Sequence, residues 1–291
     1  MKWINIKNIV LNKLNIITFL PELLNGKPKI WISYALPRWK KNKYNWGDDI
    51  NPILIEKISS KTVIPYQFSW FKHQHYLCIG SIIQWYSDKN AIIWGSGLLY
   101  PTTLIKHPKK VLAVRGPLTR ECLLKCGIAC PEVYGDPALL FPYFYMPNIQ
   151  KQYKLGIICH VSELKKLDKT LFNNGNCIFI NVKEYNRWTD FIDQILSCEM
   201  ILSSSLHGII ISDAYSIPNL WCQFTNYKAE HEGFKFRDYY LSVNKNIENP
   251  YIIDKTTNFN NLEIQIKRSW TKPIIDLNRL MKVCPFKKSI S

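Results

Sequence analysis

No stretch of the 291-residue chain approaches the roughly 20 consecutive apolar residues that a membrane-spanning helix requires. The N-terminal segment places Lys2 and Lys7 among apolar residues, but asparagine and lysine interrupt it, so no signal peptide is expected. Residues 4–20 fit an amphipathic helix, for which packing on the protein itself is favoured over lying on lipid. We therefore expect a cytoplasmic protein.

Motifs of metal and nucleophile chemistry are also missing. The chain has no G-x-S-x-G elbow, no zincin or zinc-deaminase motif and no local signature of a catalytic cysteine. Cys122, Cys126 and Cys130 are spaced C-x3-C-x3-C, which is not a usual zinc spacing, and no histidine lies nearby. We expect no metal, and we expect the nine cysteines to be structural thiols in a reducing compartment.

Acidic residues are scarce beside basic ones. The chain has 22 Asp and Glu against 38 Lys and Arg, a formal net charge of +16, and this excess favours anionic partners. An arginine-rich arm, zinc-finger spacing and RNA-binding aromatic motifs are absent, so nucleic acid is not expected as a partner. A phosphorylated substrate, or a membrane that carries a charged acceptor, agrees better with this charge.

Short apolar runs alternate with helical patterns in both halves of the chain, which predicts parallel sheets. The proline-rich segment 142–153 separates the halves. We predict an α/β protein of two Rossmann-like domains, residues 1–147 and 148–291, the second with C-terminal helices. Strands are expected at 29–35, 62–65, 76–79, 91–94, 110–114, 132–135, 155–160, 177–182, 200–202 and 219–221. Helices are expected near 47–58, 118–126, 163–172, 188–198, 206–217, 231–243, 262–270 and 274–283.

The stretch Glu199–Trp221 organises the chain. It reads as a buried strand, three serines including Ser204 and Ser205, and then a helix whose first turn contains His207. A helix N-terminus offers free N–H groups and partial positive charge, so it holds a phosphate or carboxylate readily. Open α/β sheets bind ligands at this edge. A capped helix with a surface histidine is the other interpretation of this stretch.

Several strand ends of the first half carry candidate site residues. Asp48 and Asp49 open a helix, where they either cap it or act on sugar hydroxyls. Gly95 and Gly97 follow a strand and keep that edge clear for a close backbone approach. Arg115 ends another strand, and it either forms a salt bridge or forks onto an anion. Further along the chain, Lys235 and Arg237 either form a solvated helix face or reach the same anion.

Four motifs occur in one order: N-x-GDD before an apolar helix, VLAVRGPLTRECL, YGDPALL and SSSLHGIIISDAYSIP. Over residues 29–245 the chain thereby resembles the polysaccharide pyruvyl transferase family. The resemblance implies a GT-B-like fold, in which two Rossmann-like domains face each other across a cleft. It also implies transfer of pyruvate from phosphoenolpyruvate to a sugar diol, giving a cyclic ketal and phosphate, in exopolysaccharide, capsule or cell-surface glycan synthesis. Phosphoenolpyruvate is then a co-substrate, and no cofactor is expected.

The resemblance also implies roles for residues. His207 matches the family histidine, which serves as acid/base or phosphate ligand, and Arg115 matches an arginine that binds the donor. Residues 1–147 would form the acceptor side and residues 148–291 the donor side. Many members place an arginine two residues before the histidine, where this chain has Ser205. Lys235 and Arg237 are the candidates to replace that contact.

Two alternatives remain open beside pyruvyl transfer. A glycosyltransferase of the same fold would use a sugar nucleotide, with Glu232 as a candidate ribose ligand, whereas Ser205 leaves open an inactive glycan-binding member. For the main interpretation, the acceptor is expected to be lipid-linked, and the basic surface allows peripheral contact with the inner membrane leaflet. We expect His207→Ala and Arg115→Ala to abolish turnover with little change in melting temperature.

Overall fold

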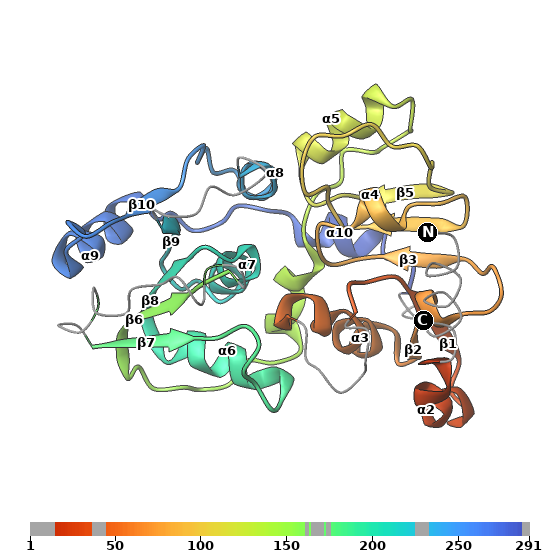
Figure 1. The fold of residues 1–291 in the computed structure, drawn as a ribbon, viewed down its shortest axis with the longest axis horizontal. Helices are drawn as coiled ribbons and strands as arrows, with labels where there is room; N and C mark the ends of the chain where they lie inside the picture. The colour runs from red at the N-terminus through yellow and green to blue at the C-terminus, as the bar shows by residue number, and fades with distance from the viewer. Residues whose placement is uncertain are drawn as a thin grey trace, which may run out of the picture.

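The computed structural model describes residues 15–36, 45–160, 163, 172, 176–224 and 233–286. It contains two five-stranded sheets, one in each half of the chain (Figure 1). Their strand orders are β2-β1-β3-β4-β5 and β10-β9-β8-β6-β7, and neighbouring strands pair in parallel. The strands are β1 Lys29–Ile32, β2 Thr62–Pro65, β3 His75–Leu77, β4 Ala91–Trp94, β5 Lys110–Ala113, β6 Tyr153–Ile158, β7 Cys177–Ile180, β8 Cys198–Ser203, β9 Asn219–Phe224 and β10 Tyr251–Ile253.

This arrangement confirms the predicted α/β class and the parallel pairing. The strands are short apolar runs because both faces of a parallel sheet are covered, and all four residues of β2 and of β4 are buried. Several bounds differ by a few residues, α4 was not predicted, and two strands differ more clearly. The segment 132–135 forms only an isolated bridge, between Val114 and Tyr134, and β10 was not predicted because three residues give no readable pattern.

Helices connect the strands and cover the sheets. Asp136 caps η3 by accepting a hydrogen bond from the Ala138 N–H at 2.9 Å. The α-helices are α2 Leu20–Leu24, α3 Trp46–Ser59, α4 Ile83–Tyr86, α5 Pro117–Lys125, α6 Trp188–Leu196, α7 Leu206–Ala214, α8 Phe234–Ser242, α9 Phe259–Ser269 and α10 Leu277–Lys282. The 3-10 helices are η1 Asn15–Phe19, η2 Tyr66–Phe68 and η3 Pro137–Tyr143.

The largest apolar cluster is shared by the two halves. Trp46 at the start of α3 packs on Phe141 and Phe191, with ring centroids 5.9 and 4.5 Å away. Its indole N–H donates to the Trp188 carbonyl at 2.8 Å, and its backbone N–H donates to the Val182 carbonyl at 2.8 Å. The amino end of α3, in the first half, is therefore fixed against the loop and helix that follow β7.

The last helix of the chain returns to the first half. The indole N–H of Trp94, in β4, donates to the Leu280 carbonyl of α10 at 3.0 Å. The ring of Phe286 lies edge-on to Tyr76 and Trp94, with centroids 4.7 and 5.7 Å away. In Figure 1 the blue α10 accordingly lies beside the sheet of β1–β5. Residues 277–286 therefore pack on the first sheet, although the sequence prediction places them in the second domain.

A buried carboxylate holds the second half together behind its sheet. Asp213, at the end of α7, is 1% exposed and accepts hydrogen bonds from Lys245 at 2.8 Å and Asn219 at 2.7 Å. Tyr239 and Trp270 donate to it at 3.0 Å each. Asp213 thus joins α7, β9, α8 and the end of α9, which makes its role in the SDAYSIP motif structural.

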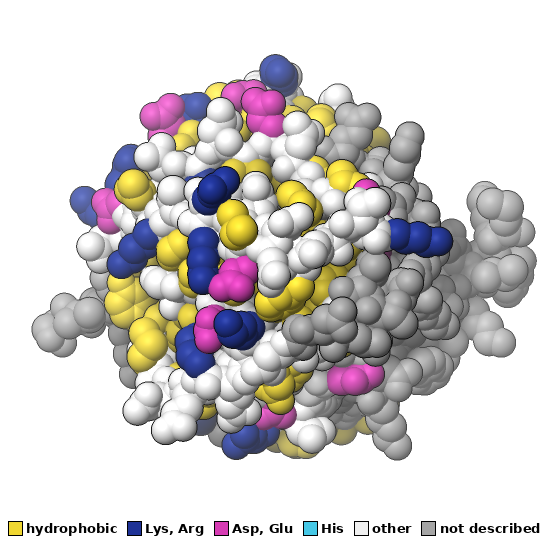
Figure 2. All heavy atoms as spheres, turned by 90° about the vertical axis from the view of Figure 1, so that its left-hand side faces the viewer, with side chains coloured by type: hydrophobic (Ala, Val, Ile, Leu, Met, Phe, Trp, Pro, Cys, Tyr) yellow, Lys and Arg dark blue, Asp and Glu magenta, His cyan; other side chains and the backbone are white. Residues whose placement is uncertain are grey.

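Some predictions lie outside the described residues: most of the 4–20 and 163–172 helices, and Glu232. Within the described ranges, no helix combines the length and apolar character that crossing a membrane requires. On the face of the second half drawn in Figure 2, lysine and arginine are interspersed with acidic and hydrophobic side chains. The net positive charge is therefore not concentrated on that face.

Candidate functional site

Polar side chains from both halves meet where the carboxyl ends of the two sets of strands face each other (Figure 1). We call this group the junction cluster. It takes residues from the amino end of α3, the end of β5, the ends of β6 and β8, the first turn of α7 and the first turn of α8. Its members are Asp48, Asp49, Arg115, His160, Glu163, Ser204, His207 and Lys235.

Several hydrogen bonds fix the first turn of α3, which carries Asp48. The Asn45 side chain caps the helix by accepting from the Gly47 N–H at 3.3 Å. Pro52 has no N–H for the Asp48 carbonyl, and the Asn51 side chain donates to that carbonyl instead, at 3.1 Å. Asn51 also bonds the backbone of Ile79, at 3.0 and 3.2 Å. The first turn of α3 is therefore fixed against the end of β3.

The absence of a side chain at Gly47 leaves space for the His207 ring. A methyl group at position 47 would lie 1.9 Å from Nδ1 of His207, so only glycine leaves room for the imidazole. His207 is 9% exposed, and its Nε2 atom is buried without a hydrogen-bond partner among the described residues. An unsatisfied buried nitrogen is costly in a folded protein, which makes Nε2 a candidate ligand-binding atom.

The charges around His207 keep it neutral. Burial, and then the positive charges of Lys235 and Arg115, lower its pKa to about 3. Burial and Lys235 likewise lower the pKa of His160 to about 4. At neutral pH the site therefore holds two neutral imidazoles, with the cationic Lys235 close to both.

Lys235 is the centre of this electrostatic arrangement. Burial and then Arg115 lower its pKa to about 8, against the opposite effects of Asp48 and Glu163. Burial and the adjacent Asp49 raise the pKa of Asp48 to about 7, against the smaller effect of Lys235. The Asp48 carboxyl and the Lys235 amine therefore both have pKa values close to neutral pH. Groups that exchange protons at pH 7 need pKa values in this range.

The serines after β8 organise the other side of the cluster. Ser204 donates from its hydroxyl to Glu163 and accepts from the His160 N–H at 2.9 Å. Burial raises the pKa of Glu163, although the bond from Ser204 opposes this. Ser205 is the N-cap of α7, but its side chain makes no capping bond. The first N–H groups of α7 have no intrahelical acceptors and lie beside His207.

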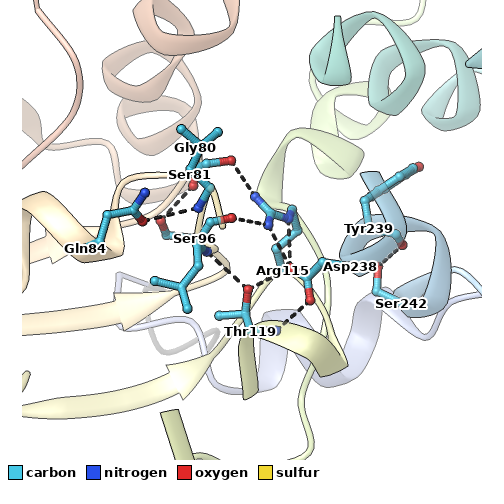
Figure 3. A network of polar contacts seen from close by, with 11 residues as sticks. Gly80, Ser81, Gln84, Ser96, Arg115, Thr119, Asp238, Tyr239 and Ser242 are labelled. Atoms are coloured by element: carbon cyan, nitrogen blue, oxygen red, sulfur yellow. Dashed lines mark hydrogen bonds and ion pairs between the residues drawn. The ribbon is translucent and has the colours of Figure 1, made fainter. Parts of the chain in front are cut away.

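The Arg115 side chain is fully buried and holds the halves together (Figure 3). Its Nε and Nη2 atoms lie 2.9 and 2.8 Å from a carboxylate oxygen of Asp238, in α8. Its other bonds go to the Ser81 hydroxyl at 2.7 Å and to the Leu98 carbonyl at 2.6 Å. Of the two expectations for Arg115, the structure shows the salt bridge, and direct donor binding stays a prediction.

Asp238 also caps α5 from the other half of the chain. Gly116, the N-cap residue of α5, has no side chain, and the Asp238 carboxylate accepts from the Thr119 N–H at 2.8 Å and hydroxyl at 2.7 Å. A methyl group at position 116 would lie 1.8 Å from the Asp238 carbonyl oxygen. The close approach of α5 and α8 therefore requires glycine, and it sets where α8 carries Lys235.

The remaining predicted residues lie near the cluster in varied roles. A methyl at Gly97 would lie 2.4 Å from the Arg115 guanidinium carbon, and one at Gly95 would meet Pro137 at 2.3 Å, so both glycines serve close packing. Asp49 accepts a hydrogen bond from the Tyr185 hydroxyl. Arg237 donates to the Glu248 carbonyl at 3.4 Å in an exposed setting.

Sequence reasoning missed five residues that shape the site. They are Gly47, Asn51, Tyr185, His160 and Asp238. Only Asn51 could have been found from a local pattern. It precedes Pro52 inside a helix, and a proline there leaves the carbonyl four residues earlier without its usual backbone donor. The partners of the others lie more than 40 positions away in the sequence.

We predict that Gly47→Ala lowers the free energy of unfolding by about 1–3 kcal/mol, because the new methyl overpacks against the imidazole of His207. In the His207→Ala background the same substitution should have no cost, because the ring is gone and alanine suits a helix better than glycine. Urea unfolding of the four proteins of this double-mutant cycle measures both effects. An equal loss in both backgrounds would show that His207 is not the neighbour that position 47 must avoid.

Comparison with known proteins places these features in a family. The family model described as polysaccharide pyruvyl transferase matches residues 14–223. An uncharacterized protein of Acanthamoeba polyphaga mimivirus is 29% identical over 228 residues, which are 76% of this chain and 77% of that protein. Succinoglycan biosynthesis protein ExoV of Rhizobium meliloti (strain 1021) is 26% identical over 213 residues, or 69% of this chain and 62% of ExoV.

Among solved structures, that of a functionally uncharacterized protein from Klebsiella pneumoniae aligns with a TM-score of 0.44 and 12% identity, over 83% of this chain and 98% of the other. The family match covers most of the chain and includes β1 to β8, Gly47, Asp48, Arg115 and His207. The chain belongs to the polysaccharide pyruvyl transferase family.

Proposed function

We propose that the protein transfers pyruvate from phosphoenolpyruvate to a sugar diol, and that the junction cluster is the site of this reaction. Family membership supports the pyruvyl transfer. The observation that carries the choice of site is the neutral His207, whose Nε2 atom has no partner among the described residues, beside Lys235 and the amino end of α7. Phosphoenolpyruvate carries a phosphate and a carboxylate, and these are the groups that a half-buried ammonium and free helix N–H groups hold.

The first chemical step needs an acid. Phosphoenolpyruvate is protonated at its methylene carbon, which leaves an oxocarbenium-like centre that a sugar hydroxyl attacks. A bound dianion raises the pKa of a neighbouring imidazole, so we propose that His207 takes up a proton as the donor binds and delivers it to that carbon. The positive charges of Lys235 and Arg115 favour this order, because they keep His207 neutral until the anion arrives.

The second step needs a base and a stabilised leaving group. The attacking hydroxyl gives its proton to Asp48, whose pKa of about 7 suits this exchange. A second hydroxyl of the same sugar then displaces phosphate and passes its proton to it, which closes the cyclic ketal. Lys235 and the α7 N–H groups would stabilise the departing phosphate. Asp49 accepts a bond from Tyr185, which makes it the weaker candidate for the base.

The contacts of Arg115 favour a positioning role over direct donor binding. Its guanidinium is already engaged with Asp238, Ser81 and Leu98, so the anion's direct cation in this proposal is Lys235. Lys235 also supplies the charge that the family's arginine would provide at the position of Ser205. We further propose a GT-B-like arrangement with the site between the two halves, and a lipid-linked precursor of a surface polysaccharide as the acceptor.

The direct test is thermal stabilisation of the purified protein by phosphoenolpyruvate, set beside a panel of sugar nucleotides. A ligand bound only by the native state raises the melting temperature with its concentration. We expect a shift with phosphoenolpyruvate, and none with sugar nucleotides. The opposite pattern would replace pyruvyl transfer by glycosyl transfer, and binding of a glycan without turnover would indicate an inactive family member.

We predict that this stabilisation weakens as the pH rises above about 8, because Lys235 then loses the proton that gives it charge. Lys235→Ala should lose the shift at pH 7, whereas Lys235→Arg should keep it at pH 9, because a guanidinium stays charged. Lys267→Ala, an exposed residue of α9, is the matched control and should behave as the parent protein. Equal shifts at pH 7 and pH 9 in the parent protein would exclude Lys235 as the cation.

A further inference from the structure

The surface next to the junction cluster is hollowed. The hollow has a volume of about 670 Å3 and opens to solvent where the loop after β7 leads into α6. Its lining includes Lys183, Tyr185, Asn186, Arg187, Asp190 and Gln194.

Tyr185 connects this hollow to the chemistry. It lines the hollow, and its hydroxyl donates to the Asp49 carboxylate. Burial, that bond and the charges of Asp49 and Asp48 together raise its pKa, so the hydroxyl lies close to both carboxylates. Tyr185 therefore lies between the hollow and the carboxylates at the start of α3.

The lining combines the groups that recognise sugars. Sugar hydroxyls both donate and accept hydrogen bonds, and their C–H faces pack on aromatic rings. The hollow offers the Tyr185 ring, the carboxylate of Asp190, and the Asn186 side chain, which has no hydrogen-bond partner among the described residues. Gln194 donates to the Asp190 carbonyl at 3.2 Å, which orients its amide at the lining.

The charges of the hollow disfavour a second anion. Two cationic side chains, Lys183 and Arg187, stand against three acidic ones, Glu184, Asp190 and Asp193. Arg187 is already paired with Asp190 at 3.0 Å. The lining thus carries one more carboxylate than cations, which disfavours a polyphosphate or nucleotide but not a neutral oligosaccharide.

We propose that this hollow is an acceptor subsite, which holds the sugar units next to the one that receives pyruvate. The proposal rests on the proposed function for the position of the reacting sugar. It places acceptor recognition on the β7–α6 segment of the second half, whereas the sequence analysis assigned the acceptor to the first half. An acceptor longer than one sugar should then bind more tightly, and the gain should come from this lining.

The test measures binding of β-linked gluco-, galacto- and manno-oligosaccharides of one to four units by isothermal titration calorimetry. We expect at least one tetrasaccharide to bind ten-fold or more tightly than its monosaccharide. In Asn186→Ala/Gln194→Ala this advantage should disappear. Asn278→Ala removes the same amide from an exposed position on α10, far from the hollow in sequence, and should leave the advantage unchanged.

The outcomes separate this proposal from the proposed function, because thermal stabilisation by phosphoenolpyruvate is measured on the same proteins. A tetrasaccharide advantage that survives in the double variant overturns the subsite. The subsite is also overturned if phosphoenolpyruvate stabilises the protein but no oligosaccharide binds. In that case the proposed donor site is still supported. If phosphoenolpyruvate gives no stabilisation while a tetrasaccharide binds through Asn186 and Gln194, the subsite stands and pyruvyl transfer falls.

Discussion

Asp238→Ala should lower the free energy of unfolding by about 3–5 kcal/mol, because it leaves the fully buried Arg115 guanidinium without its counter-charge. The same substitution removes both bonds that cap α5 through Thr119. A loss of this size corresponds to a fall in melting temperature on the order of 10 °C in a protein of this length. Urea unfolding, followed by far-UV circular dichroism, measures it.

The controls for this prediction separate charge from packing. Glu121→Gln removes an exposed carboxylate from α5 and should change the free energy of unfolding by about 0.5 kcal/mol or less. Arg115→Met/Asp238→Leu removes both charges together and should recover part of the stability that Asp238→Ala loses, because no buried charge is left unpaired. An Asp238→Ala protein as stable as the parent would show that the ion pair does not hold the halves together.

His207→Ala should lower turnover with phosphoenolpyruvate by about 10²- to 10⁴-fold, the contribution that a positioned acid makes to a proton transfer. Phosphate release in the presence of an acceptor oligosaccharide measures this turnover. The cost in stability should be small, because the buried Nε2 atom has no hydrogen-bond partner to lose in the part of the chain that the structure describes.

The control for the histidine is His107→Ala, which alters an exposed residue before β5 and should leave turnover at the parent level. The ratio of the effects on kcat and KM gives a second readout. A group that delivers the proton lowers kcat, whereas a group that only holds the donor raises its KM. Full turnover by His207→Ala would remove the histidine from the chemistry.

The fold was largely predictable because its signals are local. The runs TVIP and AIIW give β2 and β4 their bounds, since a strand buried on both faces needs an uninterrupted apolar run. The start of α7 after three serines was equally readable, and it led to His207. The crossing of α10 to the first sheet was not predictable, because it depends on contacts such as Trp94 with Leu280 that lie 186 positions apart.

The pKa values of the site residues could not be predicted from the sequence either. Residue types identified Asp48, His207 and Lys235, but their pKa values depend on burial and on one another, which only the assembled structure shows. Arg115 illustrates this best. Its position after a strand suggested either a salt bridge or an anion ligand, and we expected its loss to spare the melting temperature. A fully buried ion pair with Asp238 changes that expectation, so Arg115→Ala should lower stability as well as turnover.

The return of α10 to the first sheet has a mechanical consequence. The chain crosses between the halves twice, once through the segment 142–153 and once between α9 and α10. The halves are thus held together by non-covalent contacts of α10 with β4 as well as by the connecting segment. A protease nick within 145–152 would therefore leave the two fragments attached.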